Sequence, residues 1–302
     1  MNKRLQIADS SVEVEKRSNR KPTSHLVYFA DSRELLEQIA SETIQLAVTS
    51  PPYWSARDYE HKNQIGYNQT FDEYSESLMK IWKEAVRTLL PDGKIAVNIG
   101  NIYYNKEGEK RKIVANLMNL VWNQLNSFDN LRYMGTIHWE KSTLRKRKVL
   151  MGSYPYPSAF LISTSLEAIF VFRKTGDRKV APEIKELSKI TKAEFRKLRA
   201  PIWRINGVSN DHPAPFPHEL PRRLIKMYSF VGDKILDPFL GSGTTLVEAA
   251  RLSRNSIGVE VNRGYSKVMQ ALIQKNRRVL SHCEINFYDA QESLMFSWDG
   301  QS

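Results

Sequence analysis

The stretch KILDPFLGSGTTLVEAARL, residues 234–252, contains an apolar strand, a glycine turn and a helix in immediate succession. Gly241 and Gly243 permit a tight turn and a close approach between the backbone and a ligand. The helix is expected to begin near Thr244, so its first N–H groups would face an anionic group. A βα unit of this kind holds a ligand at the carboxyl end of a strand in α/β proteins.

The segments on either side of this unit continue the alternation of strands and helices. Helices are expected at residues 32–40, 71–90 and 113–128, and a PDG turn at 91–93 is expected to end the second. Further strands are expected at residues 25–31, 43–50, 94–100, 131–141, 166–174 and 256–261. The alternation predicts an α/β fold with a doubly wound, mostly parallel sheet.

Three classes of cofactor use a glycine turn like this one, and the neighbouring residues exclude two of them. A nucleotide P-loop requires a lysine, whereas the chain has Gly-Thr-Thr at 243–245. A dinucleotide fingerprint requires a third glycine, and Val247 or a neighbour occupies that position. A ligand with a carboxylate and a ribose remains. Glu260 follows Gly241 by 19 residues (260 − 241), close to the ~20-residue spacing at which an acid reaches ribose hydroxyls. S-adenosylmethionine has both groups. The alternative interpretation is an ordinary βα turn without a ligand, and the acids Asp237 and Glu260 beside the turn make it less favoured.

A second candidate site lies where the strand TIQLAVTS, residues 43–50, runs into Pro51-Pro52-Tyr53. Proline has no N–H, so the strand cannot continue its ladder there. The Ser50 oxygen and the Pro51 carbonyl could accept the two N–H protons of an exocyclic amine on a nucleobase. Those bonds would localise the nitrogen lone pair for attack on a methyl sulfonium. Tyr53 could stack on a base flipped out of duplex DNA, and the predicted catalysis is positioning and electrostatic stabilisation. A simple turn is the alternative interpretation.

The composition is that of a basic protein. The 302 residues include 45 Lys+Arg and 33 Asp+Glu, and the formal net charge of +12 predicts a polyanionic partner, most simply nucleic acid. The single cysteine, Cys283, excludes an internal disulfide and a cysteine-rich zinc site, and the six histidines lack metal-binding spacing. This cysteine and histidine pattern predicts no metal site. The polar N-terminus and the lack of an apolar run of about 20 residues predict a cytoplasmic protein without a membrane segment.

TSPPYW (49–54) and DPFLGSGTT (237–245) together resemble the amino-group DNA methyltransferases of the β class, in which the catalytic motif precedes the cofactor motif. HLVYFADS, TIHWEK, SLEAIFVFRK and HPAPFPHELPRRLI resemble further segments of that family, and the resemblance covers most of residues 25–275. Leu166 departs from the pattern, since many relatives have histidine there. The resemblance implies an S-adenosylmethionine-dependent methyltransferase fold. It implies catalytic roles for Ser50, Pro51, Pro52 and Tyr53, and cofactor contacts by Asp31, Asp237, Pro238, Phe239, Gly241, Gly243, Thr244 and Glu260.

Two basic segments are predicted to contact DNA. The run Arg145, Lys146, Arg147 and Lys148 is expected to line the DNA backbone. Arg196, Arg199 and Arg204 are candidate readers of bases or phosphates. They fall in residues 175–210, where the resembled family has its target-recognition insert. The expected division is a flexible arm (1–24), a catalytic part (25–174), this insert (175–210) and a cofactor-binding part (211–302).

The residues quoted above do not by themselves distinguish which base, cytosine or adenine, is methylated. Within the resembled family, serine at the position of Ser50 usually accompanies methylation of cytosine N4, and Asp or Asn accompanies adenine N6. The physical argument fits both bases, because each has an exocyclic amine beside a ring nitrogen. The sequence favours a cytosine-N4 enzyme of a restriction–modification system, a monomer or homodimer that acts on double-stranded DNA, with any cognate endonuclease acting separately. An adenine-N6 enzyme and a catalytically silent nucleic-acid-binding module are the alternatives.

Overall fold

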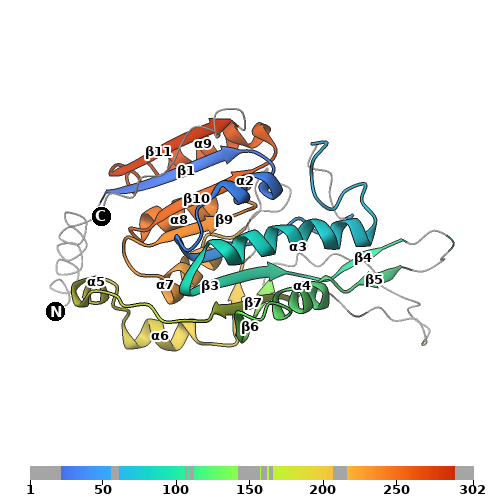
Figure 1. Cartoon of the computed structure of the whole chain (residues 1–302), viewed down its shortest axis with the longest axis horizontal. Helices are drawn as coiled ribbons and strands as arrows, with labels where there is room; N and C mark the ends of the chain where they lie inside the picture. The colour runs from blue at the N-terminus through green and yellow to red at the C-terminus, as the bar shows by residue number, and fades with distance from the viewer. Residues whose placement is uncertain are drawn as a thin grey trace, which may run out of the picture.

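A nine-stranded sheet with helices on both faces forms the centre of the part of the chain that the computed structural model describes (Figure 1). That part comprises residues 22–55, 61–105, 108, 112–141, 157, 162, 166–206 and 216–289. In spatial order the strands are β11 (Cys283–Asp289), β1 (Thr23–Phe29), β10 (Asn255–Glu260), β9 (Lys234–Asp237), β2 (Ile44–Thr49), β3 (Leu89–Ile99), β7 (Leu166–Lys174), β6 (Leu131–Lys141) and β8 (Ile202–Ile205). β7 is antiparallel to β3 and β6, and all other neighbours are parallel. The predicted doubly wound, mostly parallel sheet is confirmed.

The helices divide between the two faces because alternate residues of each strand point to opposite sides. In β2, Ala47 packs in the cluster with α2 (Ser32–Gln38), α3 (Phe71–Thr88) and α4 (Leu117–Asn126). Its neighbours Leu46 and Val48 pack in the cluster with α7 (Glu219–Tyr228). The remaining elements are β4 (Ile102–Tyr104), β5 (Ile113–Ala115), α5 (Pro182–Leu187), α6 (Lys192–Leu198), α8 (Thr244–Arg251), the 3-10 turn η1 (Arg263–Tyr265) and α9 (Ser266–Lys275).

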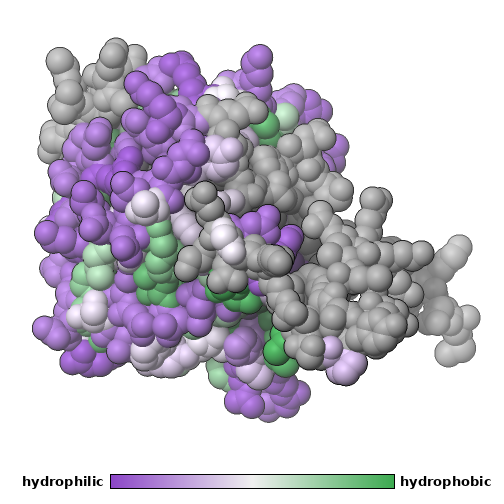
Figure 2. All heavy atoms as spheres, turned by 90° about the vertical axis from the view of Figure 1, so that its right-hand side faces the viewer, coloured by the Kyte–Doolittle hydropathy of each residue, from purple (hydrophilic) through white to green (hydrophobic). Residues whose placement is uncertain are grey.

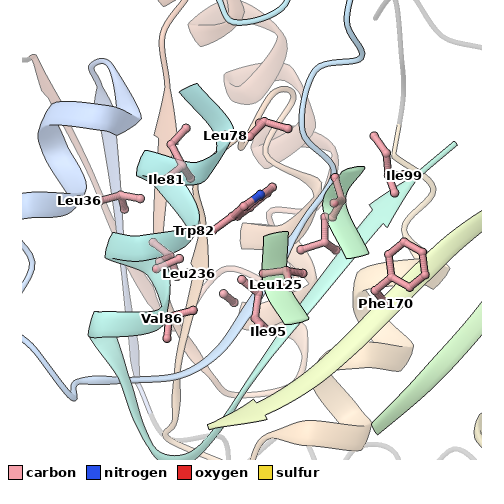
Figure 3. Close-up of a cluster of buried hydrophobic side chains, with 14 of the residues drawn as sticks. Leu36, Leu78, Ile81, Trp82, Val86, Ile95, Ile99, Leu125, Phe170 and Leu236 are labelled. Carbon is pink, nitrogen blue, oxygen red and sulfur yellow. The ribbon is translucent and has the colours of Figure 1, made fainter. Parts of the chain in front are cut away.

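Helix α3 is fixed at its start by a capping box and along its length by the core. Thr70 and Glu73 each accept a backbone N–H of the other, which satisfies two donors of the first turn. Figure 3 shows Trp82 at the centre of the buried cluster between α3, α4 and the sheet. Its indole N–H donates to Gln124 of α4 at 2.9 Å. Truncation of a tryptophan buried in this way typically costs about 3–5 kcal/mol.

Several local features differ from the sequence expectations. α3 ends at Thr88, and the PDG segment lies inside β3 instead of forming a separate turn. Asp92 has φ of 62°, and the register of β2 against β3 shifts there from Ile44–Leu89 to Leu46–Lys94. The segment therefore forms a bulge, after which β3 resumes its pairing. β1 begins at Thr23, inside the expected arm, while β11 and the β4–β5 ribbon were not predicted.

The expected insert is divided between the two ends of the sheet. Val231, just before the amino end of β9, donates its N–H to Ser188 after α5 at 2.9 Å. α5 therefore lies at the edge opposite the carboxyl ends of the parallel strands, as Figure 1 shows. β8 instead extends the main sheet, and Trp203 is fully buried. Among the described helices, none is long and apolar enough to cross a membrane.

Candidate functional site

The Ser-Pro-Pro segment and the glycine turn meet because β2 and β9 are adjacent parallel strands. Ala47 pairs with Leu236, so both strands end at the same edge of the sheet. The Thr49 hydroxyl, directly before Ser50, donates to Asp237 Oδ1 at 2.8 Å. Thr245 of α8 donates to the other carboxylate oxygen at 2.6 Å. The two predicted motifs therefore share one buried carboxylate.

The glycine turn has the backbone conformation that its residues permit. Gly241 and Gly243 have φ of 56° and 86°, in the region that favours glycine. A Cβ on Gly243 would lie at an ordinary van der Waals distance, 3.4 Å, from Met269 Cγ. Gly243 is the N-cap of α8 and supplies no side-chain cap. The start of α8 therefore offers backbone N–H groups and the positive end of the helix dipole to a carboxylate.

Glu260 lies beside this turn at the end of β10. Its carboxylate accepts N–H bonds from Gly241 and Asn262, each at 2.9 Å. Burial raises its pKa to about 7, although these bonds oppose the shift. Each carboxylate oxygen has two lone pairs, so capacity remains for ribose hydroxyls. The residues of this site fit a ligand with a ribose and a carboxylate.

Asp237 is held by side chains as well as by the backbone. Besides Thr49 and Thr245, it accepts the N–H of Phe239 at 3.0 Å. Burial raises its pKa to about 6, and the three donors partly offset that rise. These bonds hold the ends of β2 and β9 and the start of α8 around one carboxylate. A direct contact with the cofactor stays a prediction.

Other predicted cofactor residues lie at the same edge, and some have internal partners. Asp31 caps α2 by accepting the N–H of Arg33, and its carboxylate pairs with the Arg33 guanidinium at 2.5 Å. The Pro238 carbonyl accepts the Ser32 hydroxyl at 2.5 Å. The Phe239 ring is partly buried, with its centroid 6.5 Å from that of Trp82, and the Thr244 hydroxyl lies 3.2 Å from that of Ser242.

The Ser-Pro-Pro-Tyr segment is held by bonds from several elements. Tyr74 of α3 donates to the Pro52 carbonyl at 2.9 Å. Trp54 donates to the Gln69 carbonyl at 2.8 Å. The Tyr53 hydroxyl lies near the Glu167 carboxylate and the Ser50 hydroxyl. Burial, and then the Glu167 charge, raise the pKa of Tyr53 well above its usual range, so the phenol stays protonated.

Three polar residues around Ser50 were missed by the sequence analysis. Asn98 of β3 donates from Nδ2 to Ser50 Oγ at 3.3 Å and to Glu167 Oε2 at 2.7 Å. Lys141 of β6 forms an ion pair with Glu167 Oε1. Asn98 and Glu167 are 2% and 5% exposed. The available signal was a polar residue within each of two apolar strands, KIAVNIG and LEAIFVFRK. We call Ser50, Tyr53, Asn98, Lys141 and Glu167 the Ser50 cluster.

The predicted DNA-contacting residues fall into two groups. Arg145, Lys146, Arg147 and Lys148 lie outside the described residues. Arg196, Arg199 and Arg204 are exposed; Arg204 pairs with Glu140 at 2.8 Å, and Arg199 lies 6.0 Å from the Phe195 ring. Arg204 is opposite Glu140 in the β6–β8 register, next to Lys141 of the Ser50 cluster. Figure 2 shows that the described surface on the side of the β4–β5 ribbon is largely hydrophilic.

The strand order, the glycine turn at the end of β9 and the acid at the end of β10 define the S-adenosylmethionine-dependent methyltransferase fold, and S-adenosylmethionine is the cofactor. Residues 44–271 match the DNA methylase family that acts on N6 or N4 amino groups, and the chain belongs to this family.

Proteins similar to this chain include type II methyltransferases. M.MjaI of Methanocaldococcus jannaschii is 31% identical over 88% of this chain and 96% of its own length. M.MthZI of Methanothermobacter thermautotrophicus is 30% identical over 87% and 82%, respectively. Among solved structures, a DNA modification methylase of Thermus thermophilus, TTHA0409, complexed with S-adenosyl-L-methionine, has a TM-score of 0.72 at 30% identity over 88% of this chain and 98% of its own. The cytosine-N4-specific PvuII DNA methyltransferase, at 22% identity and a TM-score of 0.59, covers 90% of this chain and 98% of its own, and supports the fold alone.

Proposed function

We propose that this DNA methyltransferase transfers a methyl group from S-adenosylmethionine to N4 of cytosine in duplex DNA. The observation that carries the proposal is the position of Ser50. Its oxygen follows the carboxyl end of β2, one residue from the Thr49–Asp237 bond that joins the catalytic segment to the cofactor turn. Serine at this position is the feature that favours cytosine within the amino-group enzymes.

The chemistry requires acceptors for the amine protons. S-adenosylmethionine supplies an electrophilic methyl group on a sulfonium. The amine lone pair of a nucleobase is delocalised into the ring, so hydrogen bonds that draw the nitrogen toward tetrahedral geometry favour transfer. Ser50 Oγ and the Pro51 carbonyl are the proposed acceptors. The Pro52 carbonyl is already bonded to Tyr74, which leaves Pro51 as the proline carbonyl for the substrate.

We further propose that the substrate is duplex DNA and that the enzyme belongs to a restriction–modification system. A base inside a duplex must be flipped out to reach a site at a strand end, and the ring of Tyr53 is the proposed stacking surface. The net charge of +12 supports binding to the phosphate backbone. The type II methyltransferases M.MjaI and M.MthZI support a place in a type II restriction–modification system.

The test measures methyl transfer from radiolabelled cofactor to duplex DNA, followed by digestion to nucleosides and identification of the labelled base. N4-methylcytosine is the expected product. N6-methyladenine would contradict the choice of cytosine and support the alternative enzyme. Absence of incorporation into genomic DNA from an unrelated organism that lacks this methylation would contradict enzymatic activity and support a silent DNA-binding module.

A further inference from the structure

Glu167 is a buried carboxylate that neither contacts the cofactor turn nor belongs to the Ser-Pro-Pro-Tyr segment. It is the second residue of β7 and lies opposite Trp139 of β6. Gly100 leaves space for it, because a Cβ on that glycine would lie 2.8 Å from Glu167 Cγ. A buried carboxylate destabilises a fold unless it has charged and hydrogen-bonding partners. Its partners here all belong to the Ser50 cluster, so its placement is specific.

Glu167 determines which groups of the neighbouring side chains donate hydrogen bonds and which accept them. Glu167 forms an ion pair with Lys141, and an ionised carboxylate only accepts hydrogen bonds. Asn98 must therefore face it with the NH₂ group, since the opposite amide orientation would place two acceptors together. The same nitrogen also donates to Ser50 Oγ. One lone pair of the serine oxygen is thereby occupied by Asn98.

Tyr53 completes the arrangement. Its hydroxyl lies near both Glu167 and Ser50. The Glu167 carboxylate raises the pKa of the phenol and the Ser50 hydroxyl lowers it, which fits a phenol that turns its proton toward the carboxylate. The phenol oxygen is then available to accept the proton of the Ser50 hydroxyl. With its proton directed to Tyr53 and one lone pair occupied by Asn98, Ser50 has one lone pair left, and it acts as an acceptor.

We propose that Glu167 is a positioning residue for methyl transfer, acting through Asn98 and Tyr53 to present the Ser50 oxygen as a hydrogen-bond acceptor to the amine of the target base. This inference rests on the proposed function of Ser50. It adds a residue from β7, far from both motifs in sequence, to the group that determines the rate. Glu167 itself does not touch the base.

The test compares Glu167→Gln with the wild type in single-turnover methyl transfer. The glutamine keeps the shape of the side chain, but its amide also donates, so the direction of the Asn98 and Tyr53 bonds is no longer imposed. We expect the rate constant to fall on the order of 10²-fold, with the cofactor Kd within about 2-fold of wild type. Glu42→Gln is the matched control, because Glu42 also pairs with a lysine, Lys174, but does so at the opposite edge of the sheet.

A second variant separates positioning from stability. Glu167→Gln combined with Lys141→Met removes both charges of the ion pair, and its Tm should return toward that of wild type while the rate stays low. Recovery of the rate together with Tm would show a merely structural role and overturn the inference. A wild-type rate in Glu167→Gln alone would also overturn it and leave the proposed function intact. If the wild-type protein methylates no DNA, the proposed function and this inference fail together.

Discussion

At the scale of single residues, the site depends on side chains whose hydrogen bonds have a fixed direction. Carboxylates accept and amide nitrogens donate, so Glu167 and Asp237 each determine how several neighbours are oriented. Asp237 joins Thr49 to Thr245, and Glu167 joins Asn98 to Lys141. The two acids therefore have parallel tasks, one at the cofactor turn and one at the proposed base site.

Replacement of Ser50 by alanine should remove turnover and leave cofactor binding unchanged. The hydroxyl is the proposed acceptor for the amine, and it forms no bond to the glycine turn. Loss of one preorganised hydrogen bond at a reacting group typically lowers kcat by about 10²–10³-fold. Parallel measurements of kcat and of cofactor Kd by calorimetry check this expectation. A collapse of cofactor affinity would show that Ser50 belongs to the cofactor site instead.

At the scale of elements, the βα unit from β9 to α8 has a glycine in the left-handed region at the start of its helix. Gly243 and Gly232 have nearly equal φ values of 86° and 87°. Only Gly243 begins a helix at the site, and a Cβ there would meet Met269 at 3.4 Å, whereas one on Gly232 would meet nothing within 4 Å. Substitutions at these two glycines can therefore distinguish the effect of backbone strain from the effect of the turn on cofactor binding.

Gly243→Ala and Gly232→Ala should therefore have similar effects on stability and different effects on cofactor binding. Each places a Cβ in the left-handed region, at a cost of about 1–2 kcal/mol in unfolding free energy. Gly243→Ala should also weaken cofactor binding, because Gly243 is the N-cap of α8 and its strain falls beside the N–H groups proposed to face the cofactor carboxylate. Gly232→Ala is the strain-matched control. Urea unfolding and calorimetric titration measure the two quantities. Equal cofactor affinities in both variants would contradict the role assigned to Gly243.

The pH dependence of cofactor affinity should report the titration of Glu260. Its pKa of about 7 in the folded protein means that protonation would compete with the hydrogen bonds that we propose the ribose hydroxyls donate to the carboxylate. Affinity should fall as pH decreases below 7, approaching about tenfold per pH unit. Glu260→Gln should bind more weakly at pH 8, with little change between pH 6 and pH 8. An equally steep pH dependence in that variant would assign the effect to another group, such as Asp237, whose pKa is about 6.

The same raised pKa values affect the stability of the cofactor-free protein. A carboxyl whose folded pKa lies above its unfolded value binds protons more tightly in the folded state. Its contribution is fully present below the unfolded pKa of about 4 and is lost as pH rises through 6 to 7. These two groups therefore make the free protein less stable at pH 8 than at pH 5.

The sequence predicts the alternating elements well, because apolar periodicity and glycine turns are local signals. Ser50 and Tyr53 of the Ser50 cluster were predicted from their motif, but the other three members were not, since Asn98, Lys141 and Glu167 come from three strands that meet only through the β3–β7–β6 pairing. The PDG segment looked like the end of an element because a bulge and a turn use the same residue types. β8 was not predicted as a strand of the main sheet, because its four residues lie within the basic segment 175–210 that was interpreted as an insert.

At the scale of the whole molecule, the charge of the chain and the orientation of the sheet determine how DNA is expected to approach. The carboxyl ends of the parallel strands contain the site, and Arg204 lies beside it on β8. α5 lies at the other edge, with the exposed Lys185 on it and the exposed Lys189 just after it. A basic protein can bind DNA weakly over much of its surface, so contacts near the site must be separated from the general attraction.

DNA affinity should decrease steeply with salt, and the slope should depend on which basic residues are removed. Each phosphate contact contributes about −0.9 to the slope of log K against log salt concentration. Neutralising Arg145 and Arg147 should make the slope shallower by about 1.8, whereas neutralising Lys185 and Lys189 around α5 should leave it nearly unchanged. Fluorescence anisotropy with a duplex at several salt concentrations measures both slopes. A larger change for the α5 pair would contradict the predicted DNA face.

The shared carboxylate of Asp237 has a consequence for how the two substrates influence each other. Because Thr49 and Thr245 bond to the same group, a shift of the cofactor turn is transmitted to the strand end that carries Ser50. Such a connection couples the occupancy of one site to the free energy of binding at the other. The coupling is reciprocal, so the factor by which bound cofactor changes DNA affinity is also the factor by which bound DNA changes cofactor affinity.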